Sequence, residues 1–256
     1  MNVYVTGALW VLGVAAAAAA VTFLVHRFTR NSRNADEAVT GVFTIVAGLQ
    51  AVLLAFVLIS LFDAVSSVRD GSHTEANGLT AVYWASDSLP APAREQLQDL
   101  SRSYVHTVVE QEWPSMREGE AVGGPGWDLL ERMRSTIDGA ATRTDWQQDR
   151  KAEAAGQLWG VYEARQARLT AAGNAGISTV VWLALVVGSI LSVALPYLFD
   201  VPKLLTHALI VGTLAGTIAL LMFAIYQLQN PFSGGAQVAP DAFSSAVDRM
   251  VVRTGT

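Results

Sequence analysis

The sequence predicts an all-α membrane protein with four transmembrane helices and a helical soluble domain inserted between the second and the third. Of its 256 residues, 52% are hydrophobic and 15% are charged, whereas a soluble domain carries roughly 25% charged residues. Four stretches without Asp, Glu, Lys or Arg account for 93 residues, so the other 163 residues hold all 39 charges. No segment alternates with period two for long enough to predict a strand.

The first transmembrane hairpin covers residues 1–62 and contains spans 3–25 and 41–62. At about 1.5 Å per residue, either span can cross a hydrocarbon core of ~30 Å. Backbone groups in lipid must be satisfied within the segment, so both spans are expected to be helices. The first span is not expected to be a cleaved signal peptide, because its apolar run is long and its basic residues follow it.

The second transmembrane hairpin covers residues 177–228 and contains spans 177–199 and 204–228. The short segment Asp200-Val201-Pro202-Lys203 joins the two spans, which predicts an antiparallel pair. A short tail, residues 229–256, closes the chain.

The soluble domain, residues 63–176, is predicted to be helical. Apolar residues recur there at steps of three or four, as in Leu97, Leu100, Tyr104 and Val108 and again in Trp127, Leu130, Met133 and Ile137. The second span is free to continue as a helix into this domain, because residues 64–85 contain no proline. The domain has 17 acidic and 11 basic side chains, a net charge of −6.

Several classes of function find no support in the sequence. The spans contain no ionisable carboxylate, lysine or arginine, which argues against a proton relay or a pump. There is no cysteine, nucleotide-binding loop or nucleophile elbow, and an acidic domain disfavours nucleic acid as a partner. Two groups of polar residues lack the spacing of a metal site and are expected to be solvated or ion-paired: Asp70, His73 and Glu75, and His106 with Glu110. We therefore expect no enzyme, catalytic residue, metal or cofactor.

The second span carries a stripe of small side chains at helical spacing, namely Gly41, Thr44, Gly48, Ala51 and Ala55. Small residues let helices approach closely in lipid, so one interpretation is helix packing. The other is a pore wall, where small and weakly polar groups leave room for water and ions. Gln50 lies off the stripe and needs an interhelical partner or a wet cavity.

The fourth span contains a GxxxG motif, Gly212 to Gly216, which favours helix association. The third span offers a matching patch of small residues that includes Gly188 and Ser192. The motif can pack against the third span of the same chain or against another subunit, and the matching patch favours packing of the two spans within the chain.

Several segments together resemble the bestrophin-like membrane proteins of bacteria. They begin with residues 48–56 and Glu75-Ala76-Asn77 and continue with Tyr104 and Glu110-Gln111-Glu112-Trp113-Pro114. They end with Arg165-Gln166-Ala167-Arg168-Leu169, Trp182 and Asn230-Pro231-Phe232-Ser233-Gly234. The resemblance covers about 200 residues, and its link to true bestrophins rests on the shared layout of spans and domain.

The resemblance implies a homopentamer in the lipid bilayer that conducts inorganic anions through a central pore lined by the second span. The residues implied to line the pore are Gly41, Thr44, Gly48, Ala51, Ala55, Leu58, Ile59 and Phe62, with a neck around Val52 and residues 58–62. The acidic calcium clasp of animal bestrophins has no recognisable counterpart, and no ring of basic residues faces the implied pore.

The resemblance places the protein in the plasma (inner) membrane, with the soluble domain and both termini in the cytoplasm. Counting basic residues in the loops favours the opposite orientation, by four (Arg27, Arg30, Arg33 and Lys203) to three (Arg69, Arg165 and Arg168).

An alternative function is a non-conducting membrane sensor or scaffold whose acidic domain binds a protein partner. Its support is a surplus of tryptophan in the domain, at positions 84, 113, 127, 146 and 159, although most of these side chains are expected to lie in the core.

Overall fold

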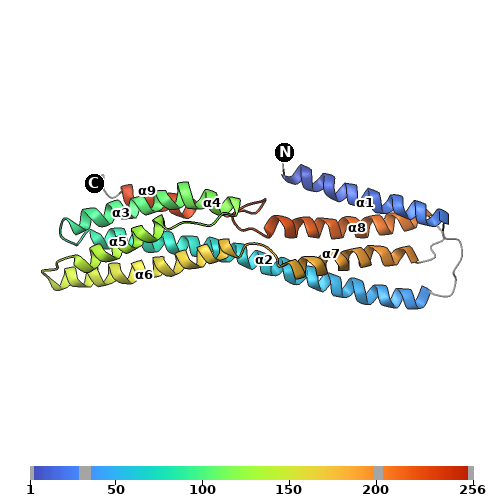
Figure 1. Cartoon of the computed structure of the whole chain (residues 1–256), viewed down its shortest axis with the longest axis horizontal. Helices are drawn as coiled ribbons and strands as arrows, with labels where there is room; N and C mark the ends of the chain where they lie inside the picture. The colour runs from blue at the N-terminus through green and yellow to red at the C-terminus, as the bar shows by residue number, and fades with distance from the viewer. Residues whose placement is uncertain (1–2, 29–35, 199–203, 253–256) are drawn as a thin grey trace. The chain divides into compact units, whose positions relative to one another are not determined.

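The computed structural model describes residues 3–28, 36–198 and 204–252, and every regular element in these residues is helical (Figure 1). Four helices are long and apolar enough to cross a membrane. They are α1 (Val3–Phe28), α2 (Asp36–Ser86), α7 (Thr179–Ala194, prolonged by a 3₁₀ turn, Leu195–Leu198) and α8 (Leu204–Leu228). The predicted four-span, all-α class is confirmed. The turn expected at residues 200–203, with Lys203, and the arginines at positions 30 and 33 lie outside the described residues.

The remaining helices follow the predicted periodicity. They are α3 (Ala93–Thr107), a π-helical segment (Val108–Glu112), α4 (Trp113–Glu118), α5 (Pro125–Gly139), α6 (Asp145–Gly173) and α9 (Asp241–Val252). The predicted apolar positions of α3 and α5 are buried, with the exception of the half-buried Trp127. Apolar periodicity therefore located both helices and their inward faces.

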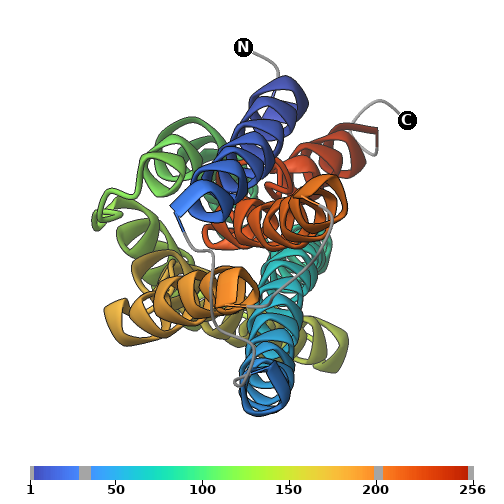
Figure 2. The ribbon, with the colours of Figure 1, turned by 90° about the vertical axis from the view of Figure 1, so that its right-hand side faces the viewer.

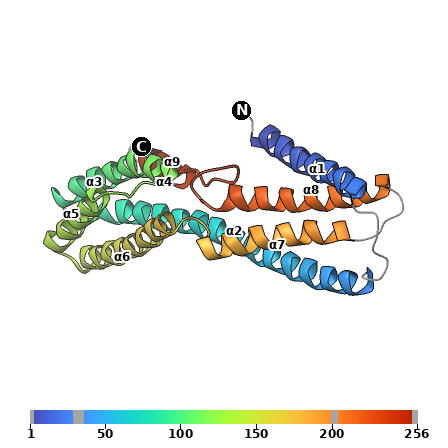
Figure 3. The ribbon, with the colours of Figure 1, turned by 45° about the vertical axis from the view of Figure 1, so that its right-hand side comes forward.

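The chain divides into two compact units, which we call the membrane unit and the helical unit. The membrane unit comprises Met1–Phe62 and Gly176–Gln229, and the helical unit comprises Asp63–Ala175 and Asn230–Thr256. The last segment is therefore more than a tail, since α9 lies beside α3 in the helical unit (Figure 3). One continuous helix, α2, contributes its first half to the membrane unit and its second half to the helical unit.

In the membrane unit the GxxxG motif packs against α1, not against α7 as the sequence analysis expected (Figures 1 and 2). A Cβ added to Gly216 would lie 3.4 Å from the Cβ of Ala15, and one added to Gly212 would lie 3.5 Å from the carbonyl oxygen of Ala15. The physical reason is that the alanine run of α1 also presents a smooth surface, which lets the two backbones approach. The expected pairing of Gly212 and Gly216 with α7 is wrong.

The small patch of α7 instead receives a polar side chain from α2. Gln50 is buried, and its amide nitrogen donates to the carbonyl oxygen of Leu185 and to the hydroxyl of Ser189, each at 3.0 Å. A Cβ on Gly188 would overlap the amide oxygen of Gln50. Gln50 thus has the interhelical partner that an amide in a membrane requires, and Gly188 provides the space for it.

Candidate functional site: an exposed helix face and a buried charge network

The expected pore stripe lies on an exposed face of α2. Seven of the eight residues expected to line a pore are exposed in the single chain: Gly41, Thr44, Gly48, Ala51, Ala55, Ile59 and Phe62. Leu58 is half-buried and lies at the edge of this face. A Cβ added to Gly41 or Gly48 would meet no atom within 4 Å in the described part of the chain. Close packing of the stripe against another helix of the same chain is therefore ruled out at these glycines, whereas a pore or a second subunit remains compatible with them.

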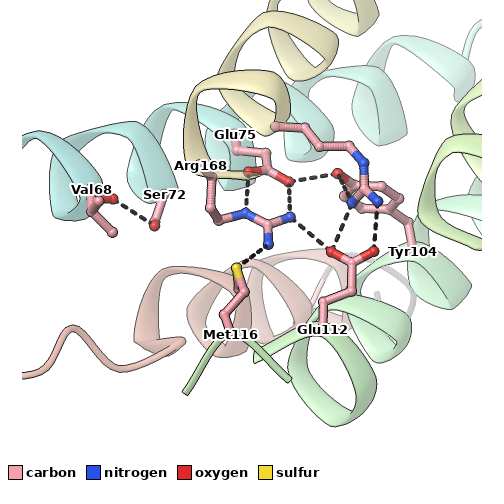
Figure 4. A network of polar contacts seen from close by, with 8 residues as sticks. Val68, Ser72, Glu75, Tyr104, Glu112, Met116 and Arg168 are labelled. Atoms are coloured by element: carbon pink, nitrogen blue, oxygen red, sulfur yellow. Dashed lines mark hydrogen bonds and ion pairs between the residues drawn. The ribbon is translucent and has the colours of Figure 1, made fainter. Parts of the chain in front are cut away.

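The helical unit contains a buried network of two glutamates and two arginines (Figure 4). Glu75 from α2 receives two hydrogen bonds from Arg168 of α6, at 2.8 Å from Nε and 2.9 Å from Nη2. The hydroxyl of Tyr104 on α3 donates to the same carboxylate at 2.5 Å. This paired, charge-assisted geometry is the strong form of a carboxylate–guanidinium contact.

Glu112, the last residue of the π-helical segment, forms the second half of the network. Both Nη atoms of Arg165 donate to its carboxylate, at 2.8 and 2.7 Å, and Nη2 of Arg168 donates to it at 3.0 Å. Arg168 therefore bridges the two carboxylates, as Figure 4 shows. The network thus links α2, the π-helical segment and α6. Its two positive and two negative charges cancel, so it has no net charge.

Aromatic rings and one glycine complete the surroundings of the arginines. The guanidinium of Arg165 lies 4.7 Å from the centre of the Trp127 ring, and that of Arg168 lies 5.6 Å from the centre of the Trp113 ring. Such cation–π contacts add to the hydrogen bonds where water is excluded. A Cβ on Gly126 would overlap the guanidinium of Arg165 and the carboxylate with which it pairs. Position 126 therefore requires glycine for space.

The ionisation of the network follows from its burial and pairing. Burial opposes the charge on Arg168, but the charge and hydrogen bonds of Glu75 more than compensate, and its pKa is raised. Burial also acts to lower the pKa of Arg165, but its hydrogen bonds with Glu112 and Tyr104 and the charge of Glu112 together outweigh it, and the pKa is raised. Burial and the neighbouring Glu75 carboxylate raise the pKa of Tyr104 well above 10. Tyr104 is thus a neutral hydrogen-bond donor at physiological pH.

This network was not predicted from the sequence, although the sequence contains a signal for it. The arginines of α6 continue the buried face of Leu158 and Val161, and Glu75 lies on the buried face of α2. A charged residue at an apolar position of an amphipathic helix predicts a buried charge with a partner. From the sequence, Glu75 is expected at a solvated or ion-paired surface, and Arg165 and Arg168 count as basic residues near the membrane.

The other polar groups considered earlier lie at the surface. Asp70 and His73 are exposed and turn away from the buried Glu75. The imidazole of His106 lies 3.0 Å from the carboxylate of Glu110, with both side chains more than half exposed, so this pair belongs to the solvated surface. Among the described residues, no group of three potential metal ligands comes together.

The tryptophans of the helical unit differ from their expected placement. Trp113 is buried and Trp127 half-buried, but Trp84, Trp146 and Trp159 are exposed. The prediction that most of them lie in the core is wrong. Polar contacts hold the two on α6 at the surface, since Arg150 lies over the ring of Trp146 and the indole of Trp159 donates to Glu163.

Fold and site together define a four-span, all-helical membrane protein with a buried charge network in its helical unit. The profile of the Bestrophin-like domain matches residues 12–243, and the chain belongs to this family. A mutant of a bacterial bestrophin homologue from Klebsiella pneumoniae has a similar structure, with a TM-score of 0.71 and 14% identity over 97% of this chain and 99% of that one. A membrane protein variant matches over the whole of both chains, with a TM-score of 0.63 and 14% identity. These likenesses concern the fold, and no curated protein gave a significant sequence match.

Proposed function

We propose that the protein is a passive ion channel of the inner membrane, with a pore formed by the exposed face of α2 from several copies of the chain. The observation that carries the proposal is that this face is uncharged, contains small residues and has open space above Gly41 and Gly48. Large apolar side chains such as Leu12 of α1 and Leu183 of α7 are exposed as well, as Phe56 is on α2, so the stripe of small residues with open space is what distinguishes the α2 face.

Family membership supports the same proposal. Bestrophins conduct anions through a pentameric pore, and the resemblance implies the same assembly and permeant ion for this chain. The narrow part of the pore would lie near Leu58, Ile59 and Phe62, where the small stripe gives way to large apolar side chains. Apolar constrictions gate channels by excluding water. The described spans carry no charge with which to drive transport, so conduction would follow the gradient.

A blocking substitution on the pore face tests the proposal. Gly48→Trp places a large ring where the single chain has open space, so folding and assembly are expected to survive while flux through reconstituted liposomes stops. Gly13→Trp is the matched control, because Gly13 on α1 is also exposed with open space above it. Flux that survives Gly48→Trp would show that this face does not line the ion path.

The orientation in the membrane is part of the proposal. Following the resemblance, we place the helical unit and both termini in the cytoplasm. The chain has no native thiol, so Ser115→Cys in α4 introduces a single labelling site. An impermeant maleimide should label it in inverted vesicles and leave it unlabelled in intact cells. Labelling of intact cells would show that the helical unit faces the outside instead.

The exposed tryptophans favour a second candidate function, a non-conducting scaffold that binds a protein partner through the helical unit. Trp146 and Trp159 are 60% and 65% exposed on α6, and tryptophan is enriched at interaction hot spots. Oligomeric mass followed by liposome flux separates the two candidates, since a monomer or dimer without flux excludes the channel.

A further inference from the structure

The exposed face of α2 has two edges of different character. Successive helix residues are rotated by about 100°, so one edge presents Thr44, Ala51 and Ala55 while the other presents Leu49 and Phe56. Leu49 and Phe56 are among the most exposed apolar side chains of the protein, at 67% and 68%. We call the edge with Thr44, Ala51 and Ala55 the shallow edge and the edge with Leu49 and Phe56 the projecting edge.

The shallow edge forms one wall of a cavity in the membrane unit. The cavity has a volume of about 320 Å³ and lies between α2, α7 and α8. Its lining is mostly apolar and includes Ala47, Ala51, Ala55, Leu58, Leu214 and Ile218. A cavity of about 150 Å³ holds a benzene ring, so this one has room for a phenylalanine ring and a second apolar side chain.

One polar atom in the cavity indicates that the cavity is incomplete in the single chain. The hydroxyl of Ser192 on α7 is buried at the cavity wall, and its oxygen finds no hydrogen-bond partner among the described residues. Most buried hydroxyls are paired, so a neighbouring group or a water that it traps would complete this wall.

We propose that this cavity is the socket of a head-to-tail interface between copies of this chain, filled by Leu49 and Phe56 from the α2 of the next copy. The inference rests on the proposed oligomeric channel. In a closed ring of identically oriented subunits, one surface of each copy meets a different surface of the next. Socket and projecting side chains lie on the same helix, within one or two residues of each other along the chain. Adjacent parallel helices would therefore bring them to the same depth.

The same arrangement sharpens the identity of the pore residues. If both edges of α2 contact neighbours, the side chains midway between the edges face the ion path, namely Gly41, Gly48, Val52 and Ile59. Thr44, Ala51, Ala55 and Leu58, expected from the sequence to line the pore, then belong to the subunit contact, and Ile59 is left to form the narrow part of the pore.

Disulfide cross-linking tests the interface in the full-length protein, which has no native cysteine. The two double variants are Leu49→Cys with Ala51→Cys, and Phe56→Cys with Ala55→Cys. Each pairs a projecting position with a socket position that differs in depth by about 3 Å or less at 1.5 Å per residue, within reach of a disulfide between adjacent helices. The four single variants are the controls.

A head-to-tail contact predicts a ladder of covalent multimers, up to the full ring, from at least one double variant and no cross-link from any single variant. Dimers from single variants would indicate a two-fold contact and overturn the inference. So would an assembled, conducting protein in which neither double variant cross-links, because another occupant such as a lipid chain would then fill the cavity. Absence of both oligomer and flux in the unmodified protein would instead refute the proposed function.

A measurement without disulfides completes the test. Phe56→Ala removes the projecting ring and should weaken the interface. We therefore expect the protein concentration below which the oligomer dissociates in detergent to rise at least tenfold. Ile190→Ala on the exposed face of α7 is the control, and it should leave dissociation unchanged. Equal behaviour of the two variants would overturn the role of Phe56.

Discussion

Neutralising Glu112 tests whether the buried charge network stabilises the helical unit. In the native protein its carboxylate accepts three hydrogen bonds from two guanidinium groups and is 4% exposed. Glu112→Gln leaves the charges of Arg165 and Arg168 facing a single carboxylate, that of Glu75. Removing one member of a buried ion pair costs about 3–5 kcal/mol, because the remaining charge is uncompensated.

The expected loss is large enough to measure by thermal unfolding in detergent. For a unit of this size ~1 kcal/mol corresponds to roughly 2–6 °C, so a loss of about 3–5 kcal/mol should lower the unfolding temperature of Glu112→Gln by roughly 6–30 °C. Glu110→Gln is the matched control, since it makes the same chemical change two residues away at an exposed site. A surface substitution of this kind changes stability by about 0.5 kcal/mol or less.

A second-site change separates charge imbalance from lost packing. Adding Arg165→Met to Glu112→Gln returns the network to one cation and one anion, so the double variant should be less destabilised than the sum of the two single variants. Equal unfolding temperatures for Glu112→Gln and Glu110→Gln would refute the reasoning, because the network would then contribute no more than an exposed pair.

Three further predictions concern space and ionisation. Gly126→Ala should destabilise the helical unit by about 1–3 kcal/mol through overlap with the buried ion pair, whereas Gly139→Ala, with open space at its Cβ, should not; equal unfolding temperatures would contradict this. Gly188→Ala should likewise lower the unfolding temperature of the membrane unit relative to Gly13→Ala, because only the former overlaps a buried amide. The raised pKa of Tyr104 means that its contribution to stability is fully present below about pH 10 and is lost as the pH rises toward the folded-state pKa. Tyr104→Phe removes that titration, so the fall in unfolding temperature above pH 10 should be shallower than in the native protein, and an unchanged slope would contradict the assignment.

The sequence predicted the elements of the fold better than their partners. A charge-free run long enough to cross lipid leaves few alternatives to a helix, and apolar periodicity marks the inward face of α3 and α5. Small-residue motifs define a surface that can approach another helix, but they do not specify which one. The contact of Gly216 with Ala15 depends on tertiary arrangement, and the alanine run of α1 is as small in its side chains as the patch of α7 that was expected to pair with the motif.

The buried network escaped prediction for a related reason. Glutamate and arginine are common residues, and only their position on an apolar helix face distinguishes those of the network from residues at the surface. Glu75 and Arg168 are 93 positions apart in the chain, so their pairing is a property of the fold. Apolar periodicity along one helix shows that a charged residue occupies a buried position. Its partner can be inferred only by pairing such residues of opposite charge from different helices.

The network also bears on how the proposed channel would select ions. Its two glutamates and two arginines cancel, so the net charge of −6 over residues 63–176 is carried entirely by the other side chains of that segment. Negative charge along an ion path attracts cations and repels anions. Anion conduction therefore requires the acidic surface to lie away from the path, whereas an acidic vestibule would favour cations. If flux through liposomes establishes conduction, the sign of the reversal potential in a potassium chloride gradient distinguishes the two arrangements and tests the anion assignment.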